Sequence, residues 1–92
     1  MLYQDYLFEC LKDPEEAAGY LNAALEDGDP GVFLLAMQNV VKAQGGIAQI
    51  AEKSHKSRTS LYKALSRNGN PYLKNIQEIL SAIGLHLAIV TA

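Results

Sequence analysis

The sequence holds few of the residues on which metal sites and disulfides depend. Among 92 residues there are one cysteine, two histidines and no tryptophan. Cys10, His55 and His86 follow no recurrent metal-ligand spacing, so we expect no metal site. A single cysteine excludes a disulfide within the chain and fits a reducing, intracellular compartment.

The sequence also lacks the patterns of an enzyme, a membrane protein or a secreted protein. No nucleophile is paired with a base, and Gly45-Gly46 does not belong to a phosphate-binding loop. No apolar run approaches the ~20 residues of a membrane span, and no basic segment followed by an apolar stretch opens the chain. We therefore expect a cytoplasmic protein that is not an enzyme, uses no cofactor and does not contact a membrane.

The charges of the chain are unevenly distributed. Residues 1–44 carry eight acidic and two basic residues, a balance of −6. Residues 45–92 carry six basic and two acidic residues, a balance of +4. Such asymmetry indicates two partners, a polyanion for the basic half and a basic protein for the acidic half. The alternative is that these charges form ordinary solvated helix faces.

Composition and helical spacing predict one all-α domain over residues 1–92. Apolar residues make up 49% of the chain, which favours folding over disorder. Three pairs, Asp13-Pro14, Asp29-Pro30 and Asn70-Pro71, each place an N-cap acceptor before a proline in a first helical turn. Five helices are expected, over residues 14–27, 30–44, 47–54, 57–66 and 71–83.

The two ends of the chain are less clearly helical. Residues 85–90 are rich in β-favouring residues and predict a short strand. Because a lone strand leaves its backbone unpaired, we expect it to join two copies of the chain through Leu85, Leu87 and Ile89. Residues 2–11 are either extended or a short helix, and their aromatic side chains either pack on the core or cover a partner.

Residues 47–65 have the pattern of two short helices that cross in a helix-turn-helix. Ala51 supplies the small residue at the crossing, and Ala64 allows close approach of the two helices. The shared core can be filled by Ile47, Ile50, Leu61 and Leu65. The second helix begins with polar residues, of which Ser57 is a suitable N-cap. In this motif the start of the second helix reaches base edges in the major groove. The domain then divides into an acidic arm and helix (1–28), a helix-turn-helix core (29–84) and the terminal strand (85–90).

A double-stranded DNA partner is therefore expected for the basic half. Arg58 can bind a guanine bidentately, and Thr59 can contact a thymine methyl group or a phosphate. The remaining candidates suit phosphate contacts or the groove edge. The predicted DNA-binding residues are Gln49, Lys56, Ser57, Arg58, Thr59, Tyr62, Lys63, Arg67 and Asn68. The alternative is a pair of packed helices with a solvated basic face.

The turn between the two helices departs from the usual pattern. A glycine followed by an aliphatic residue normally stands there, because the first residue adopts a positive φ. This chain has His55-Lys56 instead. Histidine tolerates a positive φ better than most residues, so the turn remains feasible, with Lys56 losing apolar packing or adding a phosphate contact.

With these residues in view, the sequence resembles the HigA-like antitoxins, addiction-module antidote proteins of the lambda-repressor-like (Xre-type) helix-turn-helix class. The resemblance covers about residues 5–90 and rests on a combination of short motifs. They are DPEEAAGYLNAALEDGDP (13–30), AQGGIAQIA (43–51), SRTSLYKALS (57–66), GNP (69–71) and AIGLHL (82–87).

The resemblance implies a five-helix lambda-repressor-like fold and a homodimer that represses its own operon at a palindromic site. It also implies neutralisation of a small basic toxin of the RelE/HigB type, often an mRNA-cutting ribonuclease. One alternative is a stand-alone prophage-type regulator without a toxin partner. Another is an interaction module whose helical hairpin has lost DNA binding. The acidic half favours the antitoxin over the stand-alone regulator, because it would steer a basic toxin toward itself.

Overall fold

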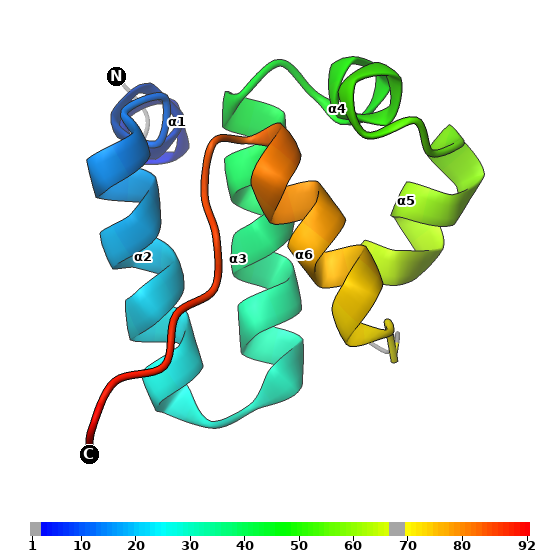
Figure 1. The fold of residues 1–92 in the computed structure, drawn as a ribbon. Helices are drawn as coiled ribbons and strands as arrows, with labels where there is room; N and C mark the ends of the chain where they lie inside the picture. Colours follow the sequence, from blue (N-terminus) through cyan, green and yellow to red (C-terminus); the bar gives the residue numbers. More distant parts are fainter. Residues whose placement is uncertain (1–2, 67–69) are drawn as a thin grey trace.

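A computed structural model describes residues 3–66 and 70–92 and contains six α-helices in those residues (Figure 1). The helices are α1 (Tyr3–Cys10), α2 (Pro14–Asp27), α3 (Pro30–Ala43), α4 (Ile47–Ser54), α5 (Arg58–Leu65) and α6 (Leu73–Ala82). Across the described ranges, no helix combines the length and the apolar character that crossing a bilayer requires.

The all-α prediction is correct, but two details of the predicted architecture are wrong. The N-terminal segment forms a helix, α1, so the described residues contain six helices and not five. The predicted strand at 85–90 is absent, and the described residues contain no second strand with which it could pair. After Gly84 the chain runs extended past α2 and α3 instead (Figure 1), with Leu85 partly buried against the core.

Two of the three expected proline-led helix starts are confirmed. The Asp13 carboxylate accepts a hydrogen bond from the Glu15 N–H at 3.0 Å, and Asp29 accepts one from the Gly31 N–H at 2.9 Å. The third prediction is wrong, because α6 begins at Leu73 rather than Pro71. Tyr72 has an extended backbone and no side-chain cap, and its carbonyl accepts the first bonds of the helix from the N–H groups of residues 75 and 76.

Helix α3 forms the centre of the core. Its Met37, Val40 and Val41 side chains are fully buried, and α3 contacts α1, α2, α4 and α5. Two side chains of α3 also bond to neighbouring helices: the Gln38 amide donates to the Leu65 carbonyl, and the Asn39 amide donates to the Tyr20 hydroxyl at 2.8 Å. In Figure 1, α1 and α2 lie on one side of α3, and α4 and α5 lie on the other.

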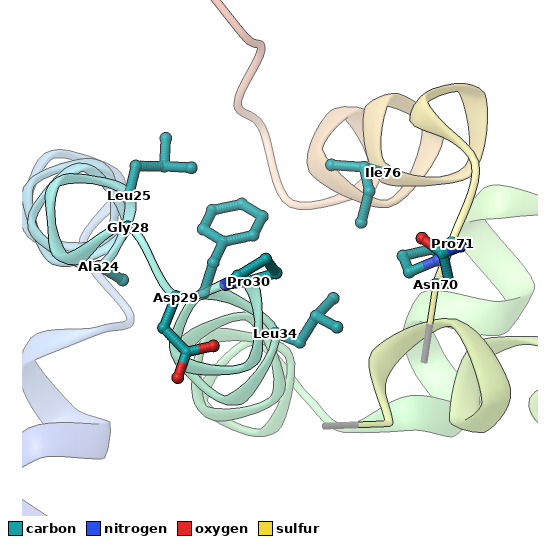
Figure 2. A pocket seen from close by; sticks show the side chains of 10 residues that line it. Ala24, Leu25, Gly28, Asp29, Pro30, Leu34, Asn70, Pro71 and Ile76 are labelled. Carbon is teal, nitrogen blue, oxygen red and sulfur yellow. The ribbon is translucent and has the colours of Figure 1, made fainter. Parts of the chain in front are cut away.

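An apolar pocket of about 300 Å³ opens between the α2–α3 turn and the start of α6. Figure 2 shows Leu34 of α3, Ile76 of α6 and Pro71, which precedes α6, around this space, with Leu25 at its other side. Its one carboxylate, Asp29, already caps α3. The pocket therefore offers an apolar surface without a charged group free to orient a ligand.

Candidate nucleic-acid interface

Helices α4 and α5 pack against each other through the residues that the sequence singled out. Ile50, Leu61 and Leu65 are fully or almost fully buried, and Ile47 is partly buried against the same core. Ala51 and Ala64 are also buried, at 7% and 8% exposure, and their small size lets the two helices approach closely. The predicted shared core of the helix pair is therefore confirmed.

The turn between α4 and α5 has the backbone conformation that its sequence made feasible. His55 adopts φ 60° and ψ 26°, the left-handed region, and is the one described residue other than glycine with a positive φ. The N–H groups of His55 and Lys56 both bond to the carbonyl of Ala51, the latter at 3.1 Å. This arrangement ends α4 in the way that a glycine usually ends a helix.

Lys56 occupies the position where an aliphatic residue is usual, and it forms an ion pair and a hydrogen bond there instead of apolar contacts. Its Nζ lies 2.7 Å from the Glu78 carboxylate and donates to the Asn75 side-chain oxygen at 2.9 Å. The side chains of Lys56 and Glu78 are 18% and 35% exposed, respectively. The hydrogen bond from Lys56 lowers the pKa of Glu78 below its ordinary value. The turn is thereby tied to α6, and a phosphate contact by Lys56 would compete with this ion pair.

The first turn of α5 presents polar side chains to solvent. The Ser57 hydroxyl caps the helix by accepting a hydrogen bond from the Ser60 N–H at 3.0 Å. Arg58, Thr59, Tyr62 and Lys63 are exposed. Within residues 3–66 and 70–92, neither Arg58 nor Lys63 forms an ion pair, so their charges are uncompensated there.

The other predicted site residues are less directly placed on this face. Gln49 is exposed, but its side chain lies back against Gly45, where a Cβ atom would overlap it. Arg67 and Asn68 fall outside the described residues. The three residues predicted to form the dimer interface differ in solvent exposure: Leu85 packs on the core, Leu87 is 37% exposed and Ile89 is fully exposed.

A recess of about 350 Å³ beside α5 brings the predicted Lys63 together with residues that the sequence analysis did not select. Lys63 lines it together with Ser60 of α5 and with Tyr72 and Asn75 at the start of α6. Its hydroxyl, amide and ammonium groups are of the kinds that contact phosphate. The sequence offered one signal for this recess, Tyr72 directly after Pro71. The prediction that the helix begins at Pro71 placed Tyr72 inside the helix, so the recess before α6 was not expected.

The comparisons with known proteins point in one direction. The family model described as "Probable addiction module antidote protein" matches residues 4–91. A protein of Haemophilus influenzae (strain ATCC 51907 / DSM 11121 / KW20 / Rd), described as uncharacterized, is 33% identical over 81 residues. That alignment covers 88% of this chain and 82% of the relative. No solved structure matches the chain.

Proposed function

Because the chain belongs to the probable addiction module antidote protein family, we propose that it is a DNA-binding antitoxin of a type II toxin–antitoxin module. In this role it represses its own operon as a homodimer on a palindromic site and neutralises a small basic toxin of the RelE/HigB type. Helices α4 and α5 serve as the helix-turn-helix, with α5 in the major groove.

The observation that carries this proposal is the start of α5. Ser57 caps a helix whose exposed first turns carry Arg58, Thr59 and Lys63. A helix that served only to pack the core would not need two cations without acidic partners. In the proposed complex Arg58 reads a base edge, while Lys63 contacts a phosphate together with the polar recess that it lines.

Dimerisation is proposed to involve the C-terminal segment in its extended, unpaired form. Ile89 and Val90 are 100% and 84% exposed, and Leu87 is partly exposed beside them. Exposed apolar side chains close together in a short segment are a common feature of association surfaces. A two-fold dimer would place two copies of α5 about one turn of DNA apart.

The experiment is a nuclease footprint of the purified full chain over the DNA upstream of its own gene, with scrambled DNA of equal length as the control. We expect two protected half-sites whose centres lie roughly 10 base pairs apart. Protection of a single, non-repeated half-site would overturn the dimeric mode. Equal affinity for the upstream and scrambled DNA would overturn operon-specific repression.

A further inference from the structure

A groove between α1 and α2 lies across the molecule from α5. Its volume is about 530 Å³, within the range of about 300–1,000 Å³ that is typical of ligand pockets. Figure 1 shows α1 and α2 on the side of α3 opposite to α5. We call this feature the α1–α2 groove, and its principal lining residues are Tyr3, Tyr6, Cys10, Glu15, Glu16 and Tyr20.

Aromatic side chains form much of the groove and are exposed to an unusual extent. Tyr3 is 78% exposed and Tyr6 is 60% exposed. Tyr20 is held in place, because its hydroxyl accepts a hydrogen bond from the Asn39 amide at 2.8 Å. Tyrosine is enriched in the cores of protein interfaces, where its ring packs and its hydroxyl bonds. The groove thus combines one fixed aromatic wall with two exposed aromatic rings.

The charge of the groove is negative, and within the described residues no cation pairs with it. Glu15 and Glu16 stand in the first turn of α2, and both are exposed. The ion pairs of the described residues are Lys12 with Glu9 and Lys56 with Glu78, so neither groove glutamate has a cationic partner there. Hydrogen bonding to Cys10 raises the pKa of Tyr6, and the nearby charge of Glu16 raises it further.

We propose that the α1–α2 groove is the docking site for an arginine- or lysine-bearing segment of the basic toxin, an inference that rests on the proposed antitoxin function. A guanidinium group can stack on a tyrosine ring while it bonds to a carboxylate, and the groove offers both partners together. Charge complementarity therefore selects the occupant.

Two other occupants fit the groove less well. DNA would be repelled by its carboxylates, since the phosphate backbone is itself negative. Lys12, beside the groove of a second copy, is already paired with Glu9. Most other cations of that copy lie on its α4–α6 side, which lies away from its own groove (Figure 1). That contact would be head-to-tail and would form open chains rather than a closed dimer. The position of the groove also leaves α5 free to bind DNA while the toxin is bound.

The test uses the full chain and the small basic protein encoded beside its gene, with affinity measured at physiological ionic strength. The groove variant is Glu15→Lys with Glu16→Lys. The matched control is Glu26→Lys with Asp27→Lys, which makes the same charge change in the last turn of the same helix. We expect at least tenfold weaker binding for the groove variant and less than a threefold change for the control, because screening at ~8 Å limits distant charges.

Two further variants separate docking from folding. Glu15→Gln with Glu16→Gln avoids placing cations at a helix N-terminus, and Tyr6→Ala removes an exposed ring. Both should weaken toxin binding at least threefold while DNA affinity stays unchanged and the protein stays fully folded at the assay temperature. The glutamine variant should lower the melting temperature only slightly, because it removes favourable charge from the helix N-terminus. The native Cys10 supplies an independent readout: its alkylation by N-ethylmaleimide should slow at least fivefold in the toxin complex and not in the DNA complex.

The outcomes distinguish this inference from the proposed function. If the native chain binds the toxin but the groove and control variants bind it equally well, the groove is not the docking site and the antitoxin function stands. If the native chain binds its operator but not the adjacent protein, both the docking site and the antitoxin role are overturned. Selective loss in the groove variants, with Cys10 protected, supports the proposal.

Discussion

His55, in the turn between α4 and α5, is the one described residue other than glycine whose backbone has a positive φ, and it is therefore strained. A residue with a Cβ pays a steric cost at φ 60°, and glycine does not. We predict that His55→Gly raises the free energy of unfolding by about 0.5–1 kcal/mol. Chemical denaturation provides the measurement. As a control, Lys53→Gly, in the last turn of α4, should lower the same quantity by up to about 1 kcal/mol. A less stable His55→Gly protein would mean that the imidazole makes contacts outweighing the strain.

The ion pair between Lys56 and Glu78 predicts a pH dependence of stability. Because the pKa of Glu78 is lower in the folded than in the unfolded chain, its stabilising effect is present above the unfolded value, about 4.3. The effect is lost as pH falls through the lower folded value. The free energy of unfolding, measured from pH 7 to pH 2.5, should therefore decline less steeply for Glu78→Gln than for the native chain. Parallel curves for the two proteins would show that the pair contributes nothing.

At the scale of the element, helix starts that depend on local chemistry were predictable. Asp13 and Asp29 each stand before a proline, and each caps its helix with its own carboxylate. The start of α6 was not predictable in this way, because Asn70-Pro71 has the same local pattern but Pro71 lines the apolar pocket, together with Leu34 and Ile76, instead of starting the helix. The first residue of α6 therefore depends on tertiary packing, which the residues adjacent in sequence do not indicate.

The C-terminal segment shows the same limit. Its alternating apolar residues favour a strand, but the structure uses Leu85 for the core and leaves Ile89 exposed. In the candidate site, the exposure of Arg58, Thr59 and Lys63 could be predicted from helical spacing. The partners of Lys56 could not, since Asn75 and Glu78 are about twenty residues away and meet it only after folding.

Because Leu85 packs on the core and Ile89 is exposed, we predict different effects on stability when each is replaced by alanine. Leu85→Ala should lower the free energy of unfolding by roughly 1–2 kcal/mol, because it removes partly buried apolar surface. Ile89→Ala should change it by less than about 0.5 kcal/mol, as is usual for exposed sites. Ile89→Ala should instead weaken the dimer in sedimentation experiments. An unchanged dimer affinity would place the interface away from the segment.

The Ser57 cap at the start of α5 gives a prediction about the stability of the α4–α5 helix pair. Removing the Ser57 hydroxyl leaves the Ser60 N–H without its acceptor. Ser57→Ala should therefore cost about 1 kcal/mol of stability. Thermal unfolding measures this, and Ser66→Ala, an exposed serine at the other end of α5, serves as the control. Equal melting temperatures for the two variants would exclude a capping role for Ser57.

At the scale of the whole molecule, the unequal charges of the sequence become two separated surfaces. The acidic residues lie mostly on α1, α2 and the turns that flank α2, while most basic residues lie on α4, the α4–α5 turn, α5 and α6. Helix α3 stands between the two groups (Figure 1). This arrangement suits a protein that contacts a polyanion on one side and a basic protein on the other, each at long range.

The central claim, that α5 reads DNA, is tested most directly by the affinity of Arg58→Ala. Fluorescence anisotropy would compare this variant with the native chain on the footprinted site and on sites with single base-pair changes. We predict a loss of roughly 1–3 kcal/mol on the native site and relaxed preference at one base pair. Uniform weakening on all sequences would make Arg58 a phosphate contact, and unchanged affinity on every site would contradict DNA reading by α5.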